Sequence, residues 1–264
     1  NMRNHEIDYR IFGEEMQYVE VELDYNETAI AEPGAFMMMD DGVMMETMFG
    51  DGSQQNNSIF GKLLNAGKRM LTGESLFMTA FTNVNQGKRR VSFASPYPGK
   101  IIPLDLSAYN NRIICQKDSF LCAAKGVNVG IEFQRKLGTG LFGGEGFIMQ
   151  KLEGDGMSFL HAGGHVFKRD LHPGETLKID TGCIVGFTSG VNYDIQFVGG
   201  IKNTLFGGEG LFFATLTGPG SVWIQTLPIS RLAGRILQYG VGARKEEGSI
   251  LGGLGNILDG DGKW

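Results

Sequence analysis

The same six residues, Leu-Phe-Gly-Gly-Glu-Gly, occur twice in the chain, at 141–146 and at 205–210. The match continues at fixed spacing, because glycines follow each glutamate nine and eleven residues later, and a Gly-Val-Asn triplet begins nineteen residues before it. Self-similarity at a fixed period predicts a repeated supersecondary unit. Glycines at matched positions favour turns that need a positive φ or a close backbone approach.

A third, weaker copy lies nearer the N-terminus, where residues 71–77 align with the start of the second hexamer. Its upstream glycine, Gly34, precedes Glu74 by 40 residues, so this copy carries about 21 extra residues. We therefore expect one compact domain over 1–264. It comprises three repeats, about 6–95 with the insertion, 96–163 and 164–235, followed by a glycine-rich tail, 236–264.

The fold class follows from alternation and turn signals. Apolar and polar residues alternate over 18–23 and 176–180, which is typical of half-buried strands. Glycine makes up 41 of 264 residues, and Pro-Gly, Asp-Gly and Ser-Gly pairs separate short apolar runs. These features predict an all-β fold of three antiparallel sandwich or barrel-like units in a pseudo-threefold arrangement. Only short helices are expected, one opening at Ser58 and one following Pro228.

Charge and composition weigh against several classes of protein. The net charge is −5, and the one dense basic run, 88–90, has no interleaved aromatic residues, so nucleic acid is not an expected partner. The three cysteines lie in apolar runs with no CxxC spacing, which favours reduced, buried thiols. No signal peptide and no membrane-spanning stretch is recognisable, so a cytoplasmic location is expected.

Several strings resemble one family in matching order. They are Lys68-Arg69-Met70-Leu71 with the following Gly-Glu-Ser-Leu-Phe, the run 96–104, both hexamers, His161-Ala162-Gly163-Gly164, and 223–235. Over roughly residues 6 to 255 the chain resembles the microbial relatives of the altered-inheritance-of-mitochondria proteins. The resemblance implies a fold like that of the tryptophan RNA-binding attenuation protein superfamily, with β units duplicated in one chain. It implies no activity, and the mitochondrial branch's association with inner-membrane organisation is analogy alone.

Three glutamates, Glu74, Glu145 and Glu209, occupy equivalent places in the repeats. A pseudo-threefold arrangement would bring them near one axis, where with the nearby His161 they would form a small-ligand or metal site. The simpler interpretation is that each glutamate accepts hydrogen bonds from its own glycine-rich turn. No cofactor is expected.

Two segments are candidates for partner contact. Methionines flank the Asp40-Asp41-Gly42 turn, and a hairpin there would be rich in methionine on both faces. Copper binding by the thioethers is the less favoured alternative. The insertion holds a short amphipathic segment that would touch a partner or pack over the β core. The contact residues expected from these segments are Met37, Met39, Met44, Ile59, Phe60 and Leu63.

No catalytic motif is present: the chain has no GxSxG, Walker A or HExxH sequence. The leading hypothesis is a non-enzymatic scaffold that forms a homo-oligomer and contacts a protein partner or a membrane surface. The alternative is a small-ligand- or metal-binding protein with its site near the repeated Gly-Gly-Glu turns.

Overall fold

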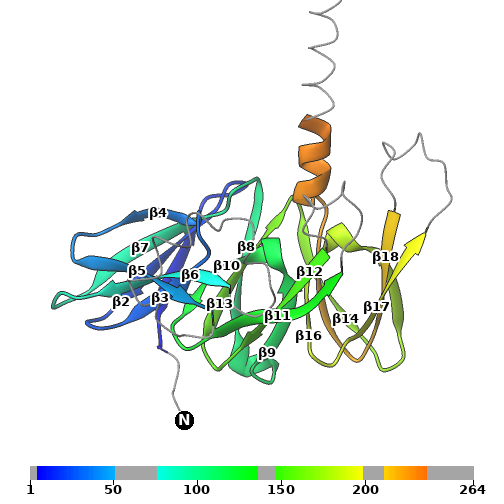
Figure 1. Ribbon diagram of the computed structural model, residues 1–264, viewed down its shortest axis with the longest axis horizontal. Helices are drawn as coiled ribbons and strands as arrows, with labels where there is room; N and C mark the ends of the chain where they lie inside the picture. Colours follow the sequence, from blue (N-terminus) through cyan, green and yellow to red (C-terminus); the bar gives the residue numbers. More distant parts are fainter. Residues whose placement is uncertain (1–4, 51–75, 136–146, 199–210, 237–264) are drawn as a thin grey trace, which may run out of the picture.

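The structure is a computed structural model that describes residues 5–50, 76–135, 147–198 and 211–236. Most of the regular secondary structure in the described chain is antiparallel β-structure, in four sheets (Figure 1). The expected all-β class is therefore confirmed. Residues 229–236 form a helix, as expected after Pro228. The segment around Ser58 lies outside the described residues.

The strands fall into three consecutive sets of six, after an initial strand β1 (Asp8–Phe12) that pairs with β2. The first set is β2 (Tyr18–Leu23), β3 (Thr28–Ala31), β4 (Phe36–Met39), β5 (Val43–Phe49), β6 (Phe77–Asn83) and β7 (Arg89–Ala94). The second set is β8 (Gly99–Asp105), β9 (Arg112–Gln116), β10 (Phe120–Ala124), β11 (Asn128–Arg135), β12 (Phe147–Glu153) and β13 (Met157–Gly163). The third set is β14 (Val166–Leu171), β15 (Thr176–Asp180), β16 (Ile184–Thr188), β17 (Asn192–Val198), β18 (Leu211–Thr217) and β19 (Gly220–Gln225). Short 3-10 helices precede and follow β9 (η2, Leu106–Tyr109; η3, Lys117–Ser119), and η4 (Thr181–Cys183) precedes β16.

Strand pairing follows one scheme in all three sets. The first and third strands pair with the sixth, while the second and fourth strands pair with the fifth. Each set therefore forms a sandwich of two three-stranded layers. The first four strands alternate between the layers, whereas the fourth and fifth are neighbours in one layer. The strands expected at 18–23 and 176–180 are confirmed as β2 and β15.

Neighbouring sandwiches share sheets. The second strand of one set pairs with the third strand of the next, β3 with β10 and β9 with β16, so two continuous six-stranded sheets join the three sandwiches in a row (Figure 1). We call the β3–β10 contact and its surroundings the first junction, and the β9–β16 contact and its surroundings the second junction. A third contact of this kind, β15 with β4, is absent from the described strands, so the pseudo-threefold arrangement is not confirmed.

Three hydrophobic clusters fill the spaces between successive sheets. Membership crosses the junctions: Ile30 of β3 packs in the cluster of the second sandwich, and Leu121 of β10 packs in that of the first. Across the second junction, Val185 of β16 packs in the cluster of the second sandwich, and Ile114 of β9 packs in that of the third. Each sandwich therefore completes its core with side chains from its neighbour.

The expected methionine hairpin is wrong. The chain does turn at Asp40–Gly42, where Gly42 has a φ of 90°, but β4 pairs with β7 in one sheet and β5 pairs with β6 in another. The turn therefore passes the chain from one layer of the sandwich to the other. Turn residues mark a change of direction without specifying the strand that will pair next.

The repeated glycines serve turns by two different means. Gly126 has a φ of 105°, whereas a Cβ on its counterpart Gly190 would lie 2.8 Å from the carbonyl oxygen of Pro219. A side chain is excluded at the first position by backbone conformation and at the second by space.

Candidate functional site

Several predicted site residues lie outside the described residues, namely Glu74, Glu145, Glu209, Ile59, Phe60 and Leu63. The convergence of the three glutamates and the contact role of the insertion stay predictions. Within the described ranges, no group of three His, Cys, Asp or Glu side chains is arranged to hold a metal ion. His161 is described, and it lies in a cavity.

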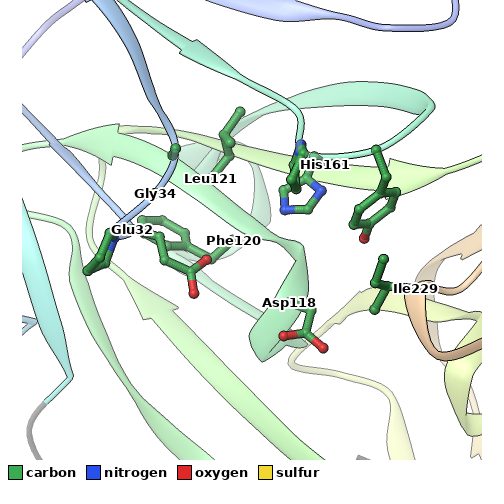
Figure 2. Close-up of a pocket in the computed structure, with 11 residues that line it drawn as sticks. Glu32, Gly34, Asp118, Phe120, Leu121, His161 and Ile229 are labelled. Atoms are coloured by element: carbon green, nitrogen blue, oxygen red, sulfur yellow. The ribbon is translucent and has the colours of Figure 1, made fainter. Parts of the chain in front are cut away.

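The cavity lies at the first junction and has a volume of about 490 Å³, within the range of small-molecule sites. It is surrounded by residues 32–35 of the first sandwich, by residues 96 and 97 between β7 and β8, by η3, β10 and β13 of the second sandwich, and by the start of the terminal helix (Figure 2). Its walls are mostly apolar, and its polar groups come from four residues. Those four are Glu32, Tyr97, Asp118 and His161.

Local turns place the two carboxylates. Glu32 follows β3 and begins a tight turn, in which Ala35 N–H donates to the Glu32 carbonyl at 3.2 Å and Gly34 has a φ of 94°. Glu32 N–H donates to the carbonyl of Leu121 at 3.1 Å, which ties this turn to β10. Asp118 lies in η3, immediately before β10. The pairing that joins the sandwiches therefore also brings these carboxylates to one cavity.

The environment of Glu32 makes its carboxyl group unusually basic. Burial raises its pKa to about 7, the negative charge of Asp118 adds to the rise, and Lys117 opposes it. Glu32 therefore exchanges its proton near neutral pH, whereas an ordinary glutamate is fully ionised there.

His161 is held neutral in the cavity wall. It lies in β13, is 3% exposed, and its ring meets the ring of Tyr97 edge-on at 5.1 Å. Burial lowers its pKa to about 4, and burial also raises the pKa of Tyr97. Nδ1 of His161 is buried with no hydrogen-bond partner among the described residues. Because a buried polar atom without a partner is costly, this nitrogen is suited to meet a bound molecule.

The second junction places different residues at the corresponding positions. Gln116 corresponds to Glu32, because each comes directly after the last residue paired across its junction, Cys115 in β9 and Ala31 in β3. Gln225 corresponds to His161 and lies 64 residues after it, which is the spacing of the repeat. Gln225 accepts from Gly163 N–H and donates to the Gly182 carbonyl, both at 2.8 Å, while Gln116 donates to the Thr181 carbonyl. Amides bonded to the backbone thus close the second junction, where the first has titratable groups and a cavity.

The predicted methionine contacts lie on a second surface. Met37 and Met39 are 47% and 38% exposed on β4, and Met44 is 44% exposed on β5. All four residues of β4 are exposed, and all are large and apolar. Such a cluster is unusual on an isolated chain and is typical of contact surfaces.

The basic run near this surface is largely matched by acidic side chains. Nζ of Lys88 lies 2.5 Å from the carboxylate of Glu22, and Nε of Arg90 lies within 3.7 Å of Glu20 and Glu22. This arrangement fits the expectation of a solvated turn. All three cysteines are free thiols; two are buried and Cys183 is partly exposed.

Sequence reasoning identified His161 and missed Glu32, Tyr97 and Asp118. The signal for Glu32 was available in the repeat: at the position where the second copy has Gln116, the first has a carboxylate. A charged residue replacing an amide at one repeat position would have indicated that the junctions differ. Pro33 and Gly34 follow Glu32, and this sequence is typical of an ordinary surface turn, so it does not by itself indicate a site.

These features define an all-β protein built of six-strand sandwiches that share sheets, with a cavity at one junction. A family model described as "Mitochondrial biogenesis AIM24" matches residues 9–227, and the chain belongs to this family. The family resemblance seen in the sequence is confirmed.

Two relatives from Streptococcus pyogenes illustrate how far the similarity extends. The chain is similar to the "Uncharacterized protein M6_Spy0233" of serotype M6, with 30% identity over 225 residues, covering 84% of this chain and 86% of the relative. It is also similar to the crystal structure of protein SPYM3_0169, with 25% identity and a TM-score of 0.69, covering 88% of this chain and 99% of that one. The fold is therefore shared with a solved structure over most of the chain.

Proposed function

We propose that this protein is a non-enzymatic, self-associating interaction scaffold. One observation carries the proposal: every side chain of β4 is large, apolar and exposed, although the corresponding strands β10 and β16 are almost wholly buried. An exposed apolar strand at a sheet edge supports association with another polypeptide. The methionines add a surface that adapts to different partners.

Sedimentation velocity of the untagged chain over a hundredfold concentration range tests self-association. We expect a concentration-dependent shift from monomer to larger species. A single monomeric species at every concentration would overturn the self-association.

Within the described ranges, no helix has the length and apolar character needed to cross a membrane. Flotation with anionic phospholipid vesicles tests whether the partner is a membrane surface, and a cytoplasmic location stays a prediction.

A specific observation favours a second function, the binding of a small organic molecule at the first junction. The cavity joins an apolar wall to the unpartnered His161 Nδ1 and to the carboxyl of Glu32, which has a raised pKa. Native mass spectrometry of gently purified protein should show a stoichiometric adduct. The adduct should be lost in His161→Gln and kept in His165→Gln, a control in the turn outside the cavity lining. Protein free of adduct after gentle lysis would count against this second function.

A further inference from the structure

We propose that copies of this chain associate head to tail, the outer edge of β15 in one copy pairing with the outer edge of β4 in the next. The inference rests on the self-association proposed above and specifies its interface. A junction of the kind seen twice within the chain would then recur between chains.

The two internal junctions follow one rule. In both, the second strand of a set pairs antiparallel with the third strand of the next set, through three residue pairs at matching positions. The first junction pairs Cys122 with Ala31, Ala123 with Ile30, and Ala124 with Ala29. The second pairs Gly186 with Cys115, Phe187 with Ile114, and Thr188 with Ile113. The sandwiches thus carry one reusable mode of contact.

Each end of the row presents one half of this contact. β4 is the third strand of the first set, and β15 is the second strand of the third set. Each lies at the edge of its sheet and has no second partner strand among those described. Figure 1 shows β4 at one end of the molecule and β18, the partner of β15, at the other. Because the edges of β4 and β15 lie at opposite ends of the molecule, they cannot pair within one chain. A second copy of the chain supplies the missing partner strand for each edge.

β4 also has the backbone form of the strands that make the internal junctions. Its register against β7 shifts between Phe36 and Met38. The corresponding strands shift at the same place, between Phe120 and Cys122 in β10 and between Ile184 and Gly186 in β16. Because a bulge re-aims the side chains that follow it, the shared bulge presents the outer edge of β4 as in β10 and β16.

Burial differs at the same positions. All five residues of β10 and four of the five in β16 are buried, whereas the four residues of β4 are 38–47% exposed. Strand addition at the β4 edge would cover its main-chain groups and its apolar side chains together. β4 therefore corresponds to β10 and β16, whose outer edges are covered by β3 and β9 within the chain.

The internal register transfers directly to the new contact. It places Met38 opposite Ile179, Met39 opposite Lys178, and Asp40 opposite Leu177 of the next copy. Lys178 takes the position of Ile30 and Ile114, both of which are buried. A lysine on an edge strand limits pairing. Association between chains is accordingly weaker than the contact within them and depends on concentration.

Paired cysteines test the register. Met39→Cys in one preparation and Lys178→Cys in another, both in a Cys183→Ser background, are mixed under mild oxidation. We expect a disulfide-linked heterodimer from the mixture and no comparable product from either variant alone. A covalent dimer of Met39→Cys alone would show that β4 pairs with β4, and would overturn the head-to-tail arrangement.

Three further variants test the energetics. Met39→Asp should weaken association at least tenfold, Lys178→Ile should strengthen it at least tenfold, and Met16→Asp, an exposed loop residue, should leave it unchanged. Self-association that persists in Met39→Asp, with no heterodimer in the cysteine mixture, would overturn this interface and leave the scaffold proposal standing. A chain that is monomeric throughout would overturn both. Closed rings and open filaments are both heterologous assemblies and support the proposal.

Discussion

The first and second junctions are built on corresponding strands and differ in the residues that line them. At the second, Gln116 and Gln225 are bonded to backbone groups of η4 and of the neighbouring sandwich. At the first, the corresponding Glu32 and His161 are titratable, have strongly shifted pKa values and border a cavity. The repeated strand pairing thus creates two corresponding sites. At the second junction, side-chain amides hydrogen-bond to the backbone, and at the first junction there is a cavity.

This difference separates what the fold needs from what a site needs. Amides satisfy the backbone at a junction without a charged group, so the fold alone does not demand a carboxyl group or an imidazole there. A partly buried carboxyl group with a raised pKa and a buried imidazole with an unpaired nitrogen both cost stability. Retaining them at one junction is reasonable where a ligand compensates for that cost.

The largest expected effect comes from breaking the closed junction. Gln225→Ala leaves the Gly163 N–H and the Gly182 carbonyl without a partner, which should cost about 2–5 kcal/mol of unfolding free energy. Urea denaturation followed by tryptophan fluorescence measures the loss. The control is the neighbouring Thr226→Ala, which removes only an exposed hydrogen bond, from the His165 N–H to the Thr226 hydroxyl. An equal effect of the two variants would mean that the Gln225 amide does not hold this junction.

Glu32→Gln makes the open junction resemble the closed one. The Glu32 pKa is raised to about 7 in the folded chain from about 4.5 in the unfolded chain, so the wild type loses stability as the pH rises through this window. The variant should be more stable than the wild type by about 3 kcal/mol at pH 8 and equal to it near pH 4. Denaturation at both pH values measures this, with the exposed Glu46→Gln as the control. A difference independent of pH would contradict the assignment.

His161→Gln reproduces the residue found at position 225 and acts in the opposite direction. The His161 pKa is lowered to about 4 when the chain folds, so the wild type loses stability as the pH falls from about 6.5 to 4. At pH 5 this loss is about 2 kcal/mol, and the variant should not show it. Melting temperatures from pH 4 to 8 follow the effect, with His172→Gln in an exposed turn as the control. If both variants have the acid sensitivity of the wild type, His161 is not its source.

The smallest effect is expected at the third copy of the Glu32 position, Asp180, which is followed by no further sandwich among the described residues. Its carboxylate lies 3.4 Å from Arg231, and both side chains are partly exposed. Arg231→Ala should cost about 0.5 kcal/mol, as is usual for exposed ion pairs. The shift in melting temperature should shrink further in 1 M NaCl. A loss comparable with that of Gln225→Ala would show that this end is as tightly organised as a junction.

Local signals in the sequence predicted the β class, strands β2 and β15, and the helix after Pro228, and the structure confirms these. Alternation at 18–23 reports a half-buried strand directly, because one face of β2 is buried and the other is not. The sequence did not predict that β4 and β5 lie in different layers. Their partners, β7 and β6, are distant in the sequence, and local signals do not identify them. Asp40–Gly42 is a strong turn signal in either topology.

The candidate site was predicted only in part, for a related reason. His161 was singled out as a possible ligand residue, but its cavity is formed by segments that meet only when β3 pairs with β10. Neither the burial of Glu32 nor the proximity of Asp118 follows from spacing along the chain. Comparing the repeats position by position, beyond the glycine motif, would have revealed the exchange of Gln116 for Glu32.

The crossing of side chains between neighbouring cores bears on how the molecule unfolds. Ile30 and Leu121 each help to fill the core of the adjacent sandwich, so opening one sandwich removes apolar contacts from the next. In such a linear array, fluctuations that expose the backbone begin at the free ends and rarely at the middle. Amide hydrogen exchange should therefore be slowest in β9, β10 and β13 and fastest in the outer strands. We therefore expect the three sandwiches to unfold cooperatively, and the strands beside the cavity to be the last to open.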